Sequence, residues 1–504
     1  MTTTGHGSIA PLRYLVVGTP AAADEMNRML SLRSAELSCV GRFDVGTDPK
    51  DRARLRVDLP AALRSARPDV AFVTIPSVFS ELLVEIRTLL RRASVPERFI
   101  PTLDDLVEGV GPRSLPDLDH AGLIDRPKRP IDHERIGALC RGRRVLVTGA
   151  GGSIGSELCL AVAEHAPAEL VMMDRSEPAV FEIDRRIARR HPSLSRRASL
   201  QDVADSAGTL RIFESTRPNV VIHAAAHKHV PLSEEHPSEA VRNNLHGSVS
   251  AVDAAIATGV SMFVLVSTDK AVAPTSVMGA TKRLAEVSVQ RRAADAGLAC
   301  TVVRFGNVLG SSGSVLDIWA REIREGGPLT LTDRRMTRYL MTIPEAAGLV
   351  LQSAAMTDID SPIGRIHVLD MGSPVRVVDL ARRFAAAHGF ELAMPIGMSE
   401  TEAKSGTLAM VETGARPGEK LHEILAQPGE VLDPTTHPAV RSWTGDIPDS
   451  EGIRRILDRT SARSNASREV VVEAIRRSVV EVDQSVTGAM GGGNCVEFSP
   501  SLRR

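Results

Sequence analysis

The sequence feature that most constrains the fold is the stretch RRVLVTGAGGSIGSELCLAVAEH, residues 143–165. It predicts an apolar strand, a turn with glycines at positions 149, 152 and 155, and a helix. Glycine permits a sharp turn, a close approach of backbone to a diphosphate, and tight packing of helix on strand. The start of the helix offers free N–H groups to phosphate, so the stretch predicts a dinucleotide-binding loop.

An acidic residue follows at the distance that such a loop requires. The next apolar strand, AELVMMD, ends at Asp174, 25 residues after Gly149, where a carboxylate can bind the adenosine ribose hydroxyls. A carboxylate repels a 2′-phosphate, so Asp174 favours NAD, while Arg175 leaves NADP open. The alternative is a structural strand–turn–helix with a surface acid.

Two further segments add candidate cofactor contacts. LQDVAD follows a third predicted strand, and NVVIHAAA is a strand that runs into a turn of small residues, against which a cofactor can lie. His223 in the second segment is interpreted as a packed strand residue rather than a base. The predicted cofactor-binding residues are Gly149, Gly152, Ser153, Ile154, Gly155, Asp174, Arg175, Asp202, Val203, Ala224, Ala225, Ala226 and Asn244.

Strand–helix alternation occurs twice along the chain. It predicts an α/β fold in which a Rossmann-type doubly wound parallel sheet follows a smaller Rossmann-like domain. The smaller domain spans residues 1–120 and keeps only Gly18 of the glycine pattern, so we expect a regulatory or assembly role there and no dinucleotide. We predict a Pro- and Asp-rich linker over 121–142, a catalytic domain over 143–430 with its substrate-binding part at about 305–430, and a partly flexible extension over 431–504.

Charge and composition exclude some partners. Lys and Arg number 61 against 62 Asp and Glu, so no global basic field exists to hold nucleic acid or an anionic membrane. No signal peptide is visible, and no apolar run approaches the roughly 18 residues of a membrane span. The five cysteines are scattered without metal-ligand spacing. We therefore expect no metal, and a cytoplasmic protein that partners could hold at the inner membrane.

Polar residues gather at the end of a later strand. SMFVLVSTDKAV, residues 261–272, predicts a buried strand with Thr268, Asp269 and Lys270 at its carboxyl end, where parallel α/β sheets bind ligands. In the following helix, VMGATKRLAEVSVQ, Met278 and Lys282 are four residues apart and share one face. The alternative is a strand-end turn that carries a surface ion pair.

These motifs carry a resemblance to known families. TGAGGSIG, STDK and GATK resemble the extended short-chain dehydrogenase/reductase superfamily, whose usual Tyr-x-x-x-Lys has Met278 at the Tyr position here. A thioether cannot exchange a proton, and neither Tyr14 nor Tyr339 can replace the missing phenol locally. HAAAHKHVP, STDKAVAPTSVMGATK, VRFGNVLGSSGSV, MTRYLMTIPEA and GARPGEKLHEIL resemble the nucleotide-sugar 4,6-dehydratases of capsule and O-antigen synthesis.

The resemblance extends from about residue 12 to about residue 430, and it is best to a large, multi-domain subgroup with Met at the Tyr position. Members usually carry N-terminal membrane helices, which this sequence lacks. The subgroup implies a UDP-N-acetylglucosamine 4,6-dehydratase that retains the C5 configuration and recycles a tightly bound NAD. Superfamily members commonly self-associate, so we expect a homo-oligomer.

The resemblance also implies residue roles. Asp269 is the expected acid for the departing 6-hydroxyl and Lys270 the expected base at C5. Lys282 is expected to bind the nicotinamide ribose. Because Met278 cannot act, Thr268 is the candidate base at C4.

A Gly- and Ser-rich turn and two arginines suit a sugar nucleotide, because the planar guanidinium fork matches phosphate oxygens. Each predicted residue has an alternative as an exposed surface group. Three other functions stay open: a C5-inverting dehydratase, a UDP-sugar 4-epimerase, and a non-catalytic NAD-binding scaffold. The predicted substrate-binding residues are Lys228, Asn307, Ser311, Ser314, Arg338, Arg416 and Glu419.

Overall fold

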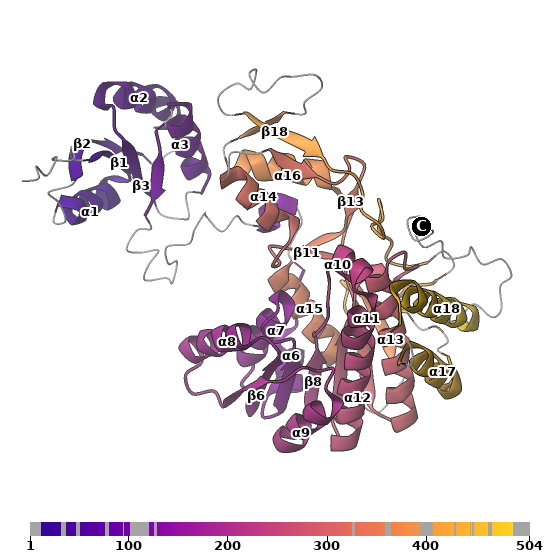
Figure 1. Ribbon diagram of the computed structural model, residues 1–504. Coiled ribbons are helices and arrows are strands. Elements are labelled where there is room, and N and C mark those ends of the chain that lie inside the picture. The colour runs from indigo at the N-terminus through magenta and orange to yellow at the C-terminus, as the bar shows by residue number, and fades with distance from the viewer. Residues whose placement is uncertain are drawn as a thin grey trace, which may run out of the picture. The chain divides into compact units, whose positions relative to one another are not determined.

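The computed structural model describes residues 12–31, 37–46, 51–75, 80–93, 95–100, 120–124, 129–324, 328–357, 364–388, 390–393, 407–427, 430–443, 445, 448–461 and 466–486. The chain separates into two compact units. The first comprises Met1–Leu123, Trp319–Thr330 and Asp379–Val411, and the second comprises Ile124–Ile318, Leu331–Val378 and Glu412–Arg504. Figure 1 shows that each unit contains both helices and strands.

The first unit contains a small parallel sheet with the strand order β2-β1-β3-β4. Its central strands β1 and β3 are largely apolar, and Leu15, Val17 and Val73 are buried in the core of this unit. Gly18 pairs with Thr74 at the end of β1, where an added Cβ would lie 2.4 Å from the Thr74 carbonyl oxygen. The elements are β1 (Leu12–Gly18), α1 (Pro20–Ser31), β2 (Leu37–Asp44), α2 (Asp51–Ala66), β3 (Val70–Thr74), α3 (Ser80–Arg92) and β4 (Glu97–Phe99).

A three-stranded sheet with the order β12-β18-β17 lies later in the chain. Trp319 of α14 is fully buried, its Nε1 donates to the Thr330 carbonyl at 2.7 Å, and its ring lies 5.7 Å from that of Phe384 in α16. The elements are α14 (Val315–Arg324), β12 (Leu329–Leu331), α16 (Val377–Ala387), β17 (Glu391–Ala393) and β18 (Thr407–Glu412).

The second unit is built on a nine-stranded sheet with the order β19-β20-β15-β10-β9-β8-β5-β6-β7. From β7 to β15 every pairing is parallel, while β20 and β19 add antiparallel edges. The predicted doubly wound sheet is therefore confirmed, and the strand order reverses between β5 and β8. The strands are β5 (Arg144–Thr148), β6 (Glu169–Asp174), β7 (Arg196–Leu200), β8 (Val220–His223), β9 (Met262–Val266), β10 (Ala299–Arg304), β15 (Arg365–Leu369), β19 (Asp433–Pro434) and β20 (Val440–Trp443).

Side chains alternate between the two faces of the sheet along each strand. Both faces carry apolar side chains, and helices cover both. Val145 and Val147 of β5 belong to one buried cluster, and Leu146 between them belongs to another. The helices of the unit are α6 (His133–Cys140), α7 (Ser153–Ala163), α8 (Glu177–Arg190), α9 (Ser206–Thr216), α10 (Val230–Glu235), α11 (Pro237–Ala240), η2 (Val241–His246), α12 (Gly247–Thr258), α13 (Val277–Ala296), α15 (Ile343–Ala355), α17 (Ser450–Ser461) and α18 (Arg468–Val486).

The linker predicted over 121–142 is wrong for its C-terminal part. Helix α6 occupies His133–Cys140, and Ile136, Leu139 and Cys140 are buried in the core of the second unit. Asp132 caps this helix by accepting from the Arg135 N–H at 3.1 Å. A helix of eight residues after a Pro-rich stretch shows little periodicity, so its apolar face escaped the sequence pattern.

The predicted C-terminal extension is also more integrated than expected. Strand β20 (Val440–Trp443) pairs with β15, so this part of the predicted extension belongs to the nine-stranded sheet. Helices α17 and α18 bury Ile456, Ile475 and Val479 in one cluster with Leu284 and Val287 of α13. The predicted flexible tail lies largely outside the described residues. None of the helices that the structure describes has the length and apolar character to cross a bilayer.

Candidate active site

The glycine loop between β5 and α7 has the tight geometry that its sequence predicts. Gly149 has a φ of +66°, and an added Cβ would lie 2.7 Å from the Ala225 backbone nitrogen. At Gly155 an added Cβ would lie 1.9 Å from the Gly149 carbonyl oxygen. Gly152 is the N-cap of α7 and no side chain caps the helix, so its first amides face the loop as a dinucleotide diphosphate would require.

A pocket opens beside this loop, at the carboxyl ends of the central strands. Most of the predicted cofactor residues line it, namely Gly149, Gly152, Asp174, Arg175, Asp202, Val203, Ala224, Ala225 and Ala226. The sequence analysis missed Thr148, Met173, Gln201, His227 and Asn243, which also line it. A sequence signal existed for several of them, since Thr148 ends β5 and Gln201 directly follows β7.

Asp174 holds the glycine loop in place. Its Oδ2 accepts from the Gly151 N–H at 3.0 Å and its Oδ1 accepts from the Ser176 N–H at 2.9 Å. The carboxylate is half-buried at the end of β6 and lines the pocket. Each of its oxygens has a further lone pair for a ribose hydroxyl.

The remaining predicted cofactor residues do not line this pocket. Asn244 is fully buried, and its amide accepts from the His227 N–H at 2.7 Å and donates to the His227 carbonyl at 3.1 Å. It therefore positions the loop after β8. The Ser153 Oγ accepts from the Ser312 N–H at 3.0 Å, and Ile154 packs against the core.

His223 is a packed strand residue, as predicted. Its ring lies 2.7 Å from the Thr148 Oγ1 and 2.9 Å from the Ser248 Oγ, and the residue is buried. Burial lowers the pKa of His223 to about 3, so the ring is neutral at physiological pH.

Thr268, Asp269 and Lys270 form a compact cluster at the end of β9. The Thr268 Oγ1 and the Lys270 Nζ both lie 3.0 Å from the same Asp269 oxygen, Oδ1. The Lys270 Nζ also donates to the Asn307 Oδ1 at 3.2 Å. The Asp269 N–H donates to the Phe305 carbonyl at 2.9 Å, which fixes the cluster to the next strand.

The second oxygen of Asp269 is notable. Asp269 is fully buried, and within the described residues its Oδ2 has no hydrogen-bond partner. A buried carboxylate oxygen without a partner is costly, and such groups gather at functional sites. The alternative of a surface ion pair is therefore wrong for Asp269.

Helix α13 brings Met278 and Lys282 against this strand end. Its Gly279 packs so closely that an added Cβ would lie 2.3 Å from the Lys270 carbonyl oxygen. Met278 is buried, and the Lys282 Nζ donates to the Val266 carbonyl at 2.7 Å. Burial lowers the pKa of Lys282 to about 8.

One predicted substrate residue, Lys228, connects two loops of the second unit. The Lys228 Nζ donates to the Ser312 carbonyl at 2.7 Å, and burial lowers its pKa. Ser311 is buried, and the Ser314 Oγ has no hydrogen-bond partner within the described residues.

The predicted arginines differ in their surroundings. The Arg338 Nη1 donates to the carbonyls of Thr337 at 2.8 Å and Leu421 at 3.2 Å. Arg416 is exposed, and its backbone N–H donates to the Glu419 Oε2 at 3.1 Å.

Lys420 was missed by the sequence analysis although it lies in the quoted segment GARPGEKLHEIL. Its Nζ donates to the Val272 carbonyl at 2.8 Å and lies 3.5 Å from the Glu423 Oε2. Burial lowers the pKa of Lys420, against the opposing charges of Glu423 and Asp269. A lysine thus lies beside the strand-end cluster.

No group of three or more His, Cys, Asp or Glu side chains suited to a metal ion occurs among the described residues.

Comparison with known proteins identifies the family. The model of the family described as "Polysaccharide biosynthesis protein" matches residues 145–444. The chain belongs to this family. The match spans the whole nine-stranded sheet except the first residue of β5.

Two curated relatives of this family member are 37% identical to it. They are the capsular polysaccharide biosynthesis protein CapD of Staphylococcus aureus, over 377 residues, and the probable polysaccharide biosynthesis protein EpsC of Bacillus subtilis, over 457 residues. The alignments cover 74% and 87% of this chain, and 60% and 73% of the relatives. The chain thus spans only part of the CapD length. The expected relation to surface-polysaccharide enzymes is confirmed at the family level.

A more distant relative is named for a defined reaction. The UDP-N-acetylglucosamine 4,6-dehydratase (inverting) of Campylobacter jejuni is 31% identical over 293 residues, which cover 56% of this chain and 77% of that protein. Among solved structures, Pen from Bacillus thuringiensis aligns with a TM-score of 0.53 and 28% identity, covering 62% of this chain and 89% of Pen.

Proposed function

We propose that this protein is an NAD-dependent UDP-N-acetylglucosamine 4,6-dehydratase that retains the C5 configuration and serves surface polysaccharide synthesis. The observation that carries the proposal is the Thr268–Asp269–Lys270 cluster, whose buried Asp269 Oδ2 has no partner within the described residues. Elimination of water from a sugar needs an acid and a base side by side, and this cluster offers both.

The residues of the glycine loop fit the expected cofactor. Gly149, Gly152 and Gly155 let the loop fold tightly, since a Cβ at each would meet protein backbone, and α7 begins there without a side-chain cap. NAD, when bound, would supply the hydride acceptor and donor that the reaction needs. Lys282 would bind the nicotinamide ribose through a side chain that α13 holds against β9. Because the hydride returns to the sugar, no external reductant is needed.

Proton transfer then falls to the strand-end cluster. Thr268 would take the proton of the C4 hydroxyl and pass it to the Asp269 Oδ1, 3.0 Å away. Lys270, once deprotonated, would remove the C5 proton, and Asp269 would protonate the departing 6-hydroxyl. Thr268 and Lys270 both contact Oδ1, so Oδ1 is the oxygen through which Asp269 would exchange protons with its two neighbours.

The sugar nucleotide would lie against the loops that follow β8 and β11 (Asn307–Leu309). Lys228, Asn307, Ser311 and Ser314 would contact the sugar or diphosphate. Arg338 and Arg416 would bind the diphosphate, and Glu419 would accept from uridine hydroxyls. We extend the proposal to a self-associating enzyme that works in the cytoplasm.

The test is to incubate the protein with UDP-N-acetylglucosamine in D₂O and to record the NMR spectrum of the product. The proposal expects a C6 methyl group, a C4 ketone or its hydrate, deuterium at C5, and the gluco configuration at that carbon. Asp269→Asn is the matched control and should yield no product. Inverted configuration at C5 would refute retention, a C4 epimer without a methyl group would indicate an epimerase, and unchanged substrate would leave only a scaffold role.

A further inference from the structure

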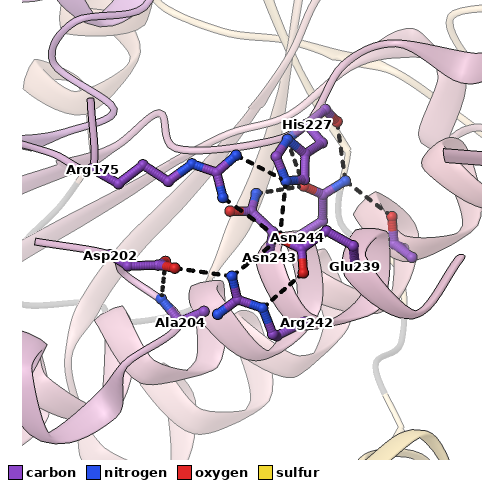
Figure 2. A network of polar contacts seen from close by, with 9 residues as sticks. Arg175, Asp202, Ala204, His227, Glu239, Arg242, Asn243 and Asn244 are labelled. Carbon is purple, nitrogen blue, oxygen red and sulfur yellow. Dashed lines mark hydrogen bonds and ion pairs between the residues drawn. The ribbon is translucent and has the colours of Figure 1, made fainter. Parts of the chain in front are cut away.

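A charged network includes three residues of the pocket lining, Arg175, Asp202 and His227. Figure 2 shows their side chains together with those of Glu239 and Arg242. The Arg242 Nε donates to the Glu239 Oε2 at 2.8 Å, and the Arg242 Nη2 donates to the Glu239 Oε1 at 3.1 Å. The same Nη2 donates to the Asp202 Oδ2 at 2.9 Å. Arg242 therefore joins two carboxylates from different segments.

Glu239 also holds the arginine that lines the pocket. Its Oε1 lies 3.5 Å from the Arg175 Nη1 and 3.4 Å from the His227 Nε2, and the Arg175 Nη2 lies 3.3 Å from that same ring nitrogen. Arg175, Asp202 and His227 line the pocket, whereas Glu239 and Arg242 are not among its lining residues. Glu239 thus acts on the pocket through Arg175.

The charges of this network balance. Burial raises the pKa of Asp202, but bonds from the Ala204 N–H and Arg242 lower it overall, and the bond from Arg242 lowers the pKa of Glu239. Both carboxyls are therefore ionised at neutral pH. Burial, followed by the charge of Arg175, lowers the pKa of His227, so its ring is neutral.

The pocket consequently has no surplus of positive charge. Arg175 and Arg242 are matched by Asp202 and Glu239, and the carboxylate of Asp174 adds one negative charge at the pocket wall. A 2′-phosphate carries nearly two negative charges and would need an arginine that is free to pair with it. A ribose 2′-hydroxyl needs only an acceptor, which Asp174 offers.

We propose that Glu239 is a specificity-determining residue that sets a preference for NAD over NADP by compensating the charge of Arg175 from outside the pocket lining. The inference rests on the proposed function in one respect, that the pocket binds a nicotinamide dinucleotide. Without the carboxylate, Arg175 is released to meet a 2′-phosphate, and the charge of the network becomes positive.

The experiment is a competition between the two cofactors on the full chain. The protein is equilibrated with equimolar NAD and NADP, separated from free nucleotide and denatured, and the released cofactors are quantified by chromatography. We expect the unaltered chain to release mostly NAD. In Glu239→Gln the ratio of NADP to NAD should rise roughly ten-fold, the effect expected from one unit charge near a dianion at a protein surface.

Two controls make the result specific. Glu235→Gln removes the same charge from an exposed position on α10 and should leave the ratio unchanged. Arg175→Gln combined with Glu239→Gln should lose the gain, because the effect passes through Arg175. A thermal melt of each variant checks folding.

The possible outcomes are separable. A folded Glu239→Gln variant with an unchanged ratio would overturn the inference while leaving the dehydratase proposal intact. An unaltered chain that prefers NADP would overturn the inference and the NAD dependence of the proposed function, but not the dehydratase reaction itself. An unaltered chain that binds neither cofactor would overturn both. A ten-fold rise that Glu235→Gln also produces would show a general charge effect and would overturn the role of Glu239.

Discussion

Strand β1 of the first unit ends in Gly18, and strand β5 of the nine-stranded sheet is followed directly by Gly149, but the two glycines serve different purposes. Gly18 closes β1 against β3, since a Cβ there would meet the Thr74 carbonyl oxygen. Gly149 instead adopts a positive φ and starts a loop with two more glycines. Helix α1 begins with Pro20, which has no backbone N–H to donate. Helix α7 begins with Ser153, after Gly152, and Ser153 keeps its backbone N–H. One glycine thus serves strand packing, and the three spaced glycines form the loop that we propose as a phosphate cradle.

The largest effect on activity should come from the Thr268–Asp269–Lys270 cluster at the end of β9, which the comparison of the two glycines does not include. Lys270→Ala should reduce turnover of UDP-N-acetylglucosamine about 10²- to 10⁴-fold, the usual contribution of a general base. Cofactor content should stay unchanged, because Lys270 contacts Asp269 and Asn307 and lies outside the pocket lining. Lys270→Arg keeps a cation that cannot release its proton, so it should be equally inactive. Turnover by Lys270→Arg would contradict the base role.

A pair of glycine variants tests the comparison directly. Gly155→Ala forces the Gly149 carbonyl aside and should abolish retained NAD, measured after gel filtration and denaturation. Gly18→Ala should lower the stability of the first unit by about 1–3 kcal/mol, the usual cost of overpacking, with NAD content unaffected. Loss of NAD from Gly18→Ala would show that the first unit also contributes to cofactor retention.

A pH-dependent effect is expected from Lys282 in the second unit. Burial lowers its pKa from the ordinary 10.5 to about 8, so between about pH 8 and 10.5 the unfolded chain binds more protons at this residue than the folded chain. The stability contribution of Lys282 should therefore rise across that window and be lost as the pH falls through 8. Urea unfolding at pH 7, 9 and 10 should show this rise, and Lys282→Met should flatten it. An equal slope in the variant would exclude Lys282 as its source.

The smallest effect concerns the segment that the sequence analysis assigned to a linker. Asp132→Ala removes the cap of α6 and should lower stability by about 1 kcal/mol, whereas Asp132→Asn, which keeps a capping oxygen, should cost less. Urea unfolding measures both. No difference between the two variants would mean that the side-chain cap at position 132 contributes little to stability.

The sequence predicted the doubly wound sheet and many of the pocket residues because both depend on short-range patterns. Asp174 and Lys270 stand at the ends of apolar strands, and parallel strand ends share one edge of a sheet. Gln201, His227 and Asn243 each adjoin a predicted residue, but which of two neighbouring residues lines the pocket depends on how the segments pack. Asn244 was assigned to the cofactor, but the structure shows its amide bound to the loop at His227.

What the sequence by itself determined was the glycine cradle, the strand-end cluster and the replacement of the usual tyrosine by Met278, since these follow from residue type and spacing along a single strand or helix. Tertiary structure alone decided which charges meet. Glu239 and Arg175 are 64 residues apart, and α6, α17 and α18 find their partners far along the chain. The physical reason is that a periodic pattern reports which face of an element is buried, whereas ion pairs and cavities form only when distant elements pack together.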